Sequence, residues 1–331
     1  MINIFCTVLL FTFIFTVVTL RKLIPYLEAK KIGQIILDVG PNWHKSKEGT
    51  PTMGGAAFVI AGIISSILAV VAFKTDMNNK EVTILLNVIC YCVLNALIGL
   101  IDDIAKMKKS KNEGLTPKTK LLFQAIAGIL FLVSLKYTSG LDTALYVPYF
   151  DKYLELGVLY YPLALIILCG IVNSVNLTDG LDGLASSVSL TVGVFITFVA
   201  IRMAFSTSLT VIGAILIGST VAFLIYNIYP AKIFMGDTGS LFLGALVVSA
   251  SFIMNSPLIV LVYGFVFVIE ALSDMIQVGY YKISKGKRIF KMAPLHHHFE
   301  KSGFSEMQIV ALFTSVNLIF CLLALFGLGN L

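Results

Sequence analysis

The sequence contains few charged residues for its length. Asp, Glu, Lys and Arg make up 13% of its 331 residues, about half the share found in soluble globular domains. Hydrophobic residues make up 58%. This composition excludes a water-soluble globule and predicts an all-α polytopic membrane protein. We expect one domain over residues 1–331, because one bundle of spans uses the whole chain.

Cysteine pairs suited to metal binding are also missing. Cys90 and Cys92 lie two residues apart and would point to different sides of a helix, which argues against a thiolate metal pair. A cleaved signal peptide is not expected, since Arg21 and Lys22 follow the first apolar run instead of preceding it. All five cysteines fall inside apolar runs and are expected to be small core residues: Cys6, Cys90, Cys92, Cys169 and Cys321.

Ten apolar runs are long enough, or nearly long enough, to cross a membrane as helices. The eighth run is short, so its helix is expected to begin inside the preceding polar segment. The ninth contains Glu270 and Asp274 and is the one expected to break, tilt or protrude. The runs are Ile4–Leu20, Gly55–Phe73, Val82–Ile101, Leu121–Tyr137, Leu156–Val172, Leu184–Met203, Leu209–Ile228, Leu241–Met254, Leu258–Val278 and Met307–Leu328.

Basic residues alternate between the loops. Assigning each of the 24 Lys and Arg residues to its nearest loop places 19 after the odd-numbered spans and 5 after the even-numbered spans. The odd loops are therefore predicted to be cytoplasmic, and both termini are predicted to lie outside. The net charge of +6 reflects this topology and predicts no nucleic-acid partner. Residues 138–155 are expected to form an external loop with a small hairpin.

Polar residues able to do chemistry collect on the predicted cytoplasmic side. Asp237 begins an Asp-Thr-Gly-Ser sequence in the polar segment Asn227 to Ser240. At a helix start, Asp237 would lie beside free backbone N–H groups that favour phosphate, which predicts a metal ion held against a pyrophosphate. The alternative is that Asp237 only caps the next helix.

Two further segments carry carboxylates at span ends. Asp102 and Asp103 would repel each other unless a cation or shared proton relieves them, and Lys106 lies one helical turn beyond Asp102. A solvated helix end is the alternative. The segment 173–183 contains two Asp-Gly steps and two asparagines, a turn suited to binding a sugar or base, although a simple turn remains possible.

The remaining candidates are a histidine run and a loop rich in glycine and threonine. His296, His297 and His298 cannot share one helix face, so at most two are expected at one ligand. They could bind zinc or donate to phosphate, but oxygen ligands without cysteine suit magnesium better. Lys47 to Gly55 could approach a phosphate or simply lead into the second span.

These motifs together resemble the phospho-N-acetylmuramoyl-pentapeptide transferase (MraY) family of the polyprenyl-phosphate N-acetylhexosamine-1-phosphate transferase superfamily. The resemblance rests on the segments 47–55, 102–103, 173–183 and 227–240 and on the Leu-His-His-His-Phe run. It implies ten transmembrane helices, a homodimer and a Mg²⁺-dependent cytoplasmic active-site cleft in the bacterial plasma membrane. The family moves phospho-MurNAc-pentapeptide from UDP-MurNAc-pentapeptide to undecaprenyl phosphate, which yields lipid I and UMP.

The resemblance also implies roles for individual residues. Asp237 would be the metal ligand, and Asp102 would deprotonate the lipid phosphate. Lys118 lies two residues from Lys120 and is the alternative lysine at that place. The implied catalytic residues are Asp102, Asp103, Lys106, Lys120, Asp237 and His296. The implied substrate-binding residues are Lys47, Thr52, Asn176, Asp179, Gly180, Leu181, Asp182, Phe234, Gln277 and His297.

Two other functions remain compatible with the sequence. The chain could transfer GlcNAc-1-phosphate within the same superfamily. An ion-coupled transporter would also carry intramembrane acids, but transporters place them near the bilayer midplane. Only Glu270 fits such a position, and it could equally pair with another group or solvate a helix bend.

Overall fold

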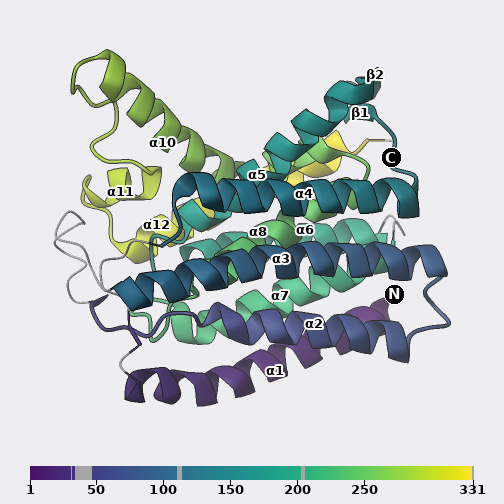
Figure 1. The fold of residues 1–331 in the computed structure, drawn as a ribbon, viewed down its shortest axis with the longest axis horizontal. Helices are drawn as coiled ribbons and strands as arrows, with labels where there is room; N and C mark the ends of the chain where they lie inside the picture. Colours follow the sequence, from purple (N-terminus) through teal and green to yellow (C-terminus); the bar gives the residue numbers. More distant parts are fainter. Residues whose placement is uncertain (31, 34–46, 110–113, 203–205, 330–331) are drawn as a thin grey trace.

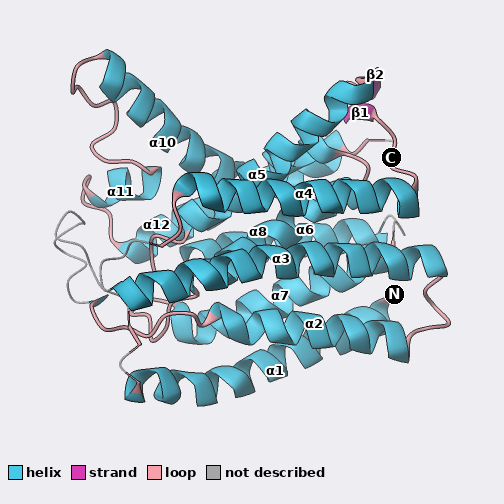
Figure 2. Ribbon diagram, in the orientation of Figure 1, coloured by secondary structure: helices cyan, strands magenta, loops and turns pink. Residues whose placement is uncertain are grey.

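The computed structural model describes residues 1–30, 32–33, 47–109, 114–202 and 206–329. Figure 1 shows long helices packed side by side, and Figure 2 shows that the only strands in the described residues form one small hairpin at the edge. The predicted all-α polytopic fold is confirmed. The long helices are α1 (Ile2–Ala29), α2 (Gly55–Ala72), α3 (Asn79–Lys109), α4 (Pro117–Ser139), α5 (Tyr160–Thr178), α6 (Leu184–Arg202), α7 (Thr207–Asn227), α8 (Gly236–Ile253) and α12 (Glu306–Gly327).

These nine helices are each long and apolar enough to cross a membrane. A tenth candidate span is broken: α9 (Val260–Tyr263), with the short 3₁₀ turn Pro257–Ile259 before it, meets α10 (Phe265–Ile283) at an angle of 86°. The break falls at Gly264, inside the predicted ninth span. The prediction that this span would break is therefore confirmed, and Leu258–Val278 is not one straight helix.

Helix α8 lies at the centre of the bundle, packed against α3 and α5. Residues 238–252 of α8 are all buried. Glycines let neighbouring backbones approach: a Cβ at Gly55 would stand 2.2 Å from the Cα of Gly239, and a Cβ at Gly244 would stand 2.8 Å from the Cα of Val172. Lipid tails are as apolar as the side chains of a neighbouring helix, so apolar surface alone does not drive helices together in a membrane. Close backbone packing at small residues does.

The structure corrects the prediction that all five cysteines are core residues. Cys92, Cys169 and Cys321 are buried, but Cys6 and Cys90 are exposed on the outer surface of their helices. Hydropathy does not separate a helix face that contacts lipid from one that contacts protein, since both are apolar.

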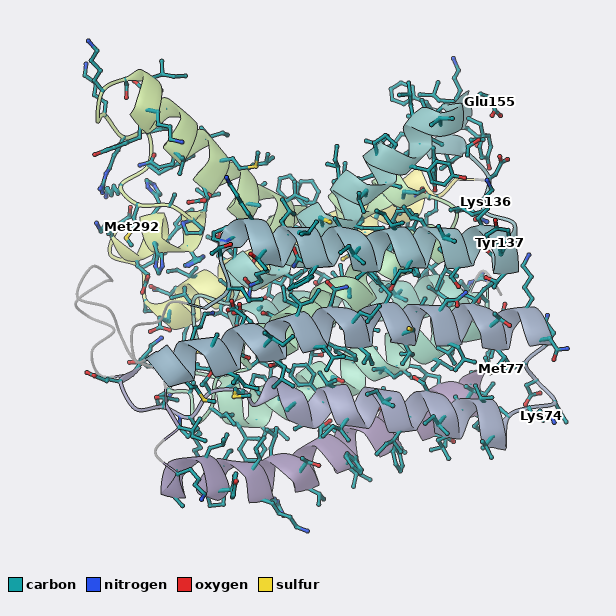
Figure 3. The ribbon with its side chains drawn as sticks, viewed as in Figure 1. Lys74, Met77, Lys136, Tyr137, Glu155 and Met292 are labelled. Atoms are coloured by element: carbon teal, nitrogen blue, oxygen red, sulfur yellow. The ribbon has the colours of Figure 1, made fainter. Side chains whose placement is uncertain are left out.

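Loops that the sequence assigned to opposite sides lie at opposite ends of the bundle. In Figure 3, Lys74, Lys136 and Glu155 lie at one end, and Met292 lies at the other. The predicted hairpin is present as strands β1 (Ala144–Val147) and β2 (Lys152–Glu155), paired antiparallel. The N terminus and the last turn of α12 lie at the hairpin end (Figure 1). Which end faces outside stays a prediction.

Candidate active site

A carboxylate from α3 fixes the start of α8. Asp103 accepts hydrogen bonds from the backbone N–H groups of Asp237, at 3.0 Å, and Thr238, at 2.9 Å. It also accepts one from the Thr238 hydroxyl at 2.7 Å. Helix N-termini leave such N–H groups unsatisfied, and a carboxylate there also complements the helix dipole. The capping alternative for Asp237 is thus wrong, because Asp103 caps the helix and the Asp237 side chain binds groups of other helices.

Two lysines from different helices bind the Asp237 carboxylate. Lys120, in the first turn of α4, pairs with Oδ2 at 2.5 Å, and Lys106, near the end of α3, pairs with Oδ1 at 3.2 Å. Lys106 also pairs with Asp102 at 2.7 Å, one helical turn away, as the sequence predicted. Asp102 in turn accepts a hydrogen bond from the Leu115 backbone N–H at 2.6 Å. Asp102 and Asp237 therefore share one ammonium group.

Asn176, near the end of α5, completes this group. Its amide nitrogen donates to Asp237 at 3.1 Å and to the Ser240 hydroxyl at 2.7 Å, and its amide oxygen accepts from Lys120 at 3.3 Å. Helices α3, α4, α5 and α8 thus each contribute a polar side chain to one cluster. Between the two lysines considered for this place, Lys120 contacts Asp237 and Lys118 is exposed.

Three of these side chains offer a donor set for a hard cation. One oxygen each from Asp102, Asp103 and Asp237 lie within 4.8 Å of one another. All the ligand atoms are oxygens, which suits magnesium and does not suit zinc. Two histidines of the run pair with carboxylates outside this cluster. His296 Nδ1 lies 2.6 Å from Glu270, and His297 Nδ1 lies 2.6 Å from Glu300.

A second polar group lies where the segments 173–183 and 227–235 meet. Lys47 pairs with Asp182 and with Glu306, at 2.7 Å each. Asp182 also accepts from the Ala231 N–H at 2.9 Å, and the Glu306 carboxylate accepts from the Asp182 N–H at 3.2 Å. The loop before α2, the turn after α5 and the start of α12 are thereby joined by side chains.

Backbone hydrogen bonds place the Lys47–Gly55 segment against the start of α8. The Phe234 N–H donates to the Pro51 carbonyl at 2.8 Å, and the Gly54 N–H donates to the Phe234 carbonyl at 2.9 Å. Asn227 secures the other side, because it accepts from the Gly183 N–H and donates to the Ile233 carbonyl. The polar segment 227–240 is therefore held from two directions.

The turn after α5 brings three more predicted residues to this region. Burial raises the pKa of Asp179 well above its usual range, and the charges of nearby carboxylates, Asp237 foremost, raise it further. Leu181 is buried, whereas Thr52 is half-buried and makes no side-chain hydrogen bond within the described residues. Gly180 faces the ring of His296: a Cβ there would stand 2.3 Å from Nε2.

Gln277 holds the loop that precedes the histidines. Its side-chain oxygen accepts from the N–H groups of Ile289 and Phe290, at 3.1 and 3.0 Å, and its nitrogen donates to the Phe290 carbonyl at 3.3 Å. Its amide is therefore engaged by the protein's own backbone. The short helix α11 (Leu295–Glu300) follows this loop and carries the three histidines.

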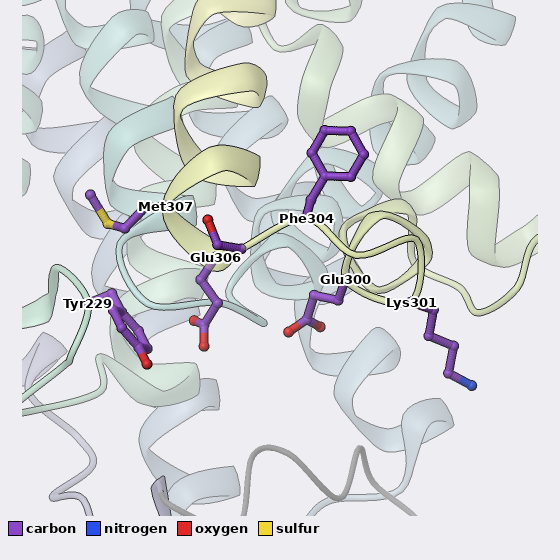
Figure 4. A pocket seen from close by; sticks show the side chains of 7 residues that line it. Tyr229, Glu300, Lys301, Phe304, Glu306 and Met307 are labelled. Carbon is purple, nitrogen blue, oxygen red and sulfur yellow. The ribbon is translucent and has the colours of Figure 1, made fainter.

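A pocket of about 520 Å³ opens beside the second polar group. In Figure 4, the carboxylates of Glu300 and Glu306 point into the same space, with Tyr229 on one side and Lys301 on the other. Its lining residues are Tyr229, Glu300, Lys301, Phe304, Ser305, Glu306 and Met307.

Comparison with known proteins identifies the family of this chain. The model of glycosyl transferase family 4 matches residues 85–255, and signature 1 of phospho-N-acetylmuramoyl-pentapeptide-transferase matches residues 47–59. A phospho-N-acetylmuramoyl-pentapeptide-transferase of Clostridium acetobutylicum is 42% identical over 96% of this chain and 97% of its own length. This chain belongs to that transferase family.

Other members of the phospho-N-acetylmuramoyl-pentapeptide-transferase family are similar over nearly the same span. The protein of Acetivibrio thermocellus is 39% identical over 97% of this chain and 94% of its own length, and that of Halalkalibacterium halodurans is 39% identical over 96% and 95%. The chain is therefore a transferase and a multi-pass membrane protein. The family-4 match includes α8, while the signature covers Lys47 and Thr52.

Sequence reasoning missed three residues that the structure places in these two polar groups. Glu306 binds Lys47, but its position in the first turn of α12, after the Ser305 cap, reads as an ordinary helix start. Asn227 and Ser240 stand inside the polar segment singled out by the sequence, yet no spacing rule connects them to Gly183 or Asn176. The excess of polar residues in that segment was the only available signal.

Proposed function

We propose that this transferase moves phospho-MurNAc-pentapeptide from UDP-MurNAc-pentapeptide to undecaprenyl phosphate. The products are lipid I and UMP, and the reaction is the first membrane step of peptidoglycan synthesis. The near-full-length identity to phospho-N-acetylmuramoyl-pentapeptide-transferases carries this proposal. The convergence of acids and lysines from α3, α4 and α8, together with Asn176 from α5, supports it.

Asp237 is proposed as the ligand of a Mg²⁺ ion. The neighbouring carboxylate oxygens of Asp102 and Asp103 supply the all-oxygen environment that magnesium prefers. When bound, the ion would neutralise charge on the substrate diphosphate and favour UMP as leaving group. Both oxygens of Asp103 also accept hydrogen bonds from the first turn of α8, which fixes this carboxylate against the helix that carries Asp237.

The residues around Asp237 suit phosphoryl transfer between two anionic partners. Such a reaction depends on alignment and charge neutralisation more than on covalent chemistry. Lys106 and Lys120 provide two ammonium groups within one carboxylate's reach, and we assign them to substrate phosphate oxygens. Asp102, held by Lys106 and the Leu115 N–H, is assigned as the proton acceptor for the lipid phosphate. His296 completes the proposed catalytic set.

The lipid phosphate is proposed to attack the β-phosphorus directly. The competing route passes through an aspartyl-phosphate on the enzyme. Incubating the protein with β-³²P-labelled UDP-MurNAc-pentapeptide, without the lipid, separates the two routes. The direct route predicts no label on the denatured protein, and stoichiometric label on an aspartate would overturn it.

The remaining predicted residues are proposed to bind the nucleotide sugar. They come from the loop before α2, the end of α5 and the turn after it, the segment before α8, and helices α10 and α11. The pocket beside Glu306 opens next to Lys47 and Asp182 and offers room for the part of the substrate beyond the diphosphate. The proposed set is Lys47, Thr52, Asn176, Asp179, Gly180, Leu181, Asp182, Phe234, Gln277 and His297.

UMP release with purified protein tests the choice of substrate. We expect release with UDP-MurNAc-pentapeptide and undecaprenyl phosphate, and little or none with UDP-GlcNAc. Turnover only with UDP-GlcNAc would make the protein a GlcNAc-1-phosphate transferase. Substrate flux in sealed vesicles without any nucleotide release would instead favour an ion-coupled transporter.

The location and assembly of the protein follow from the same proposal. A lipid acceptor and a water-soluble nucleotide meet most directly at the membrane surface, so we place the site at the cytoplasmic face of the bacterial plasma membrane. One domain over residues 1–331 and a homodimer are also proposed. A mass measurement on the detergent-solubilised protein that gives one chain per particle would refute the dimer.

A further inference from the structure

Glu270 is a fully buried carboxylate that binds one residue twice. It lies on α10, just after the break at Gly264, with an exposed fraction of 0%. One oxygen accepts the backbone N–H of His296 at 3.0 Å, and the other lies 2.6 Å from His296 Nδ1. A buried charge is stable only when it is paired and hydrogen-bonded. The only such partner within the described residues is His296.

This pairing fixes where the imidazole carries a proton. An ionised carboxylate accepts hydrogen bonds and cannot donate, so Nδ1 must hold the shared proton. The two bonds also fix the orientation of the ring, because the backbone and the side chain of His296 are tied to the same group. A carboxylate behind a histidine sets the tautomer and orientation presented by the other nitrogen.

The other nitrogen of the ring has no partner within the described part of the chain. His296 is 1% exposed, and Nε2 makes no hydrogen bond within the described residues. It faces the turn after α5 at Gly180, where the absence of a side chain leaves room for the imidazole ring. A buried polar atom without a partner is costly unless a ligand satisfies it. A bound ligand would supply the missing partner.

We propose that Glu270 is a positioning residue for the transfer reaction: it holds His296 so that Nε2 forms a hydrogen bond with the nucleotide sugar beside Gly180. This inference rests on the proposed function. Glu270 does not touch the substrate and acts only through His296. The same carboxylate also ties α11 to the broken span α9–α10.

Replacing the carboxylate by an amide tests the tautomer directly. In Glu270→Gln, the amide oxygen is needed by the His296 N–H, so the NH₂ group faces Nδ1 and the ring proton moves to Nε2. The chain has four histidines, so ¹⁵N-histidine spectra are assignable with a His296→Ala sample. We expect the wild-type His296 signal to show a protonated Nδ1 and the Glu270→Gln signal to show a protonated Nε2. A wild-type ring without a proton on Nδ1 would overturn the proposal.

Kinetics test whether the arrangement serves the reaction. We expect Glu270→Gln to lower kcat/KM for the UDP-sugar by about 10- to 100-fold, with no change in KM for the lipid. Glu270→Asp, which keeps the carboxylate, should recover part of the loss. In a His296→Ala background, Glu270→Gln should add no further loss. Equal losses with and without His296 would contradict a role through that residue.

A carboxylate at the other end of the bundle provides the control. Glu81 also accepts two hydrogen bonds, from the Ser206 hydroxyl at 2.8 Å and the Ser208 N–H at 2.7 Å, and it lies far from the site on α3. Glu81→Gln should leave both the His296 spectrum and kcat/KM unchanged. If the wild-type protein releases no UMP, the proposed function fails, while the spectra still decide the Glu270 arrangement.

Discussion

Asp237 holds an ammonium group on each of its two carboxylate oxygens, one from α3 and one from α4. Lysines this close to a proposed diphosphate site reduce the repulsion between the two anionic substrates. They also balance the negative charge of the aspartate. The neutral side chain of Asn176 donates a third hydrogen bond to the Asp237 carboxylate. At the scale of single residues, the candidate site is therefore a set of paired carboxylates and ammonium groups, and no single reactive group dominates it.

Lys120 and Lys118 form a matched pair for testing this view. Both lie in the first turn of α4, but only Lys120 reaches Asp237, and Lys118 is exposed. We expect Lys120→Met to lower kcat/KM for UMP release on the order of 100-fold. Lys118→Met should remain within about twofold of wild type, as expected of a solvated surface charge.

The two substitutions are compared in one steady-state assay with both substrates. Similar losses in the two variants would show that the general positive charge of α4 matters, and not the contact with Asp237. A fully active Lys120→Met would remove Lys120 from the proposed catalytic set.

At the scale of secondary-structure elements, the close approach of the α3 and α8 backbones positions the site. A Cβ at Gly99 would stand 2.3 Å from the Asp237 carbonyl oxygen, so α3 and α8 touch where the site begins. The Asp103 carboxylate then fastens the first turn of α8 to α3. The position of Asp237 therefore depends on the packing of these two helices.

Gly99→Ala tests the α3–α8 contact. The added methyl group meets backbone and cannot be relieved by a side-chain rotation, so we expect destabilisation of about 1–3 kcal/mol with loss of activity. Gly170→Ala is the control, because a Cβ there meets nothing within 4 Å. Thermal unfolding of the detergent-solubilised proteins measures both. Equal unfolding temperatures for the two variants would contradict a close α3–α8 contact that matters for stability.

Elements were more predictable from the sequence than the contacts between them. Apolar runs located the spans, the shortness of the eighth run placed the start of α8 inside the polar segment, and two acids in the ninth run marked the broken helix. Hydropathy could not supply the rotation of each helix about its axis, so the exposure of Cys6 and Cys90 was predicted wrongly. The Lys47–Glu306 and Glu270–His296 pairs join residues far apart in sequence and depend on that rotation.

At the scale of the whole molecule, the polar cluster and the hairpin lie at opposite ends of one apolar bundle. Figures 1 and 3 place the loop before α11 at one end and the loops around Lys74 and Glu155 at the other. The excess of basic residues in the odd loops predicts that the first end is cytoplasmic. The proposed nucleotide substrate would reach the site from that end.

Thiol labelling of intact cells tests this orientation. In a background without the five native cysteines, Lys74→Cys and Lys152→Cys should react with a membrane-impermeant maleimide from outside. Arg288→Cys should react only after the membrane is permeabilised. The reverse pattern would place the polar cluster outside the cell and contradict the proposed use of a cytoplasmic nucleotide.

The account depends most on Asp237 as the metal ligand of a transferase. UMP release is measured for the wild type and for Asp237→Asn, with saturating UDP-MurNAc-pentapeptide and undecaprenyl phosphate, with and without Mg²⁺. Asp76→Asn, an exposed carboxylate in the loop after α2, is the control. We predict that the wild type and Asp76→Asn require Mg²⁺, and that Asp237→Asn loses about 100-fold or more while remaining folded. Near-normal UMP release by folded Asp237→Asn would contradict the account.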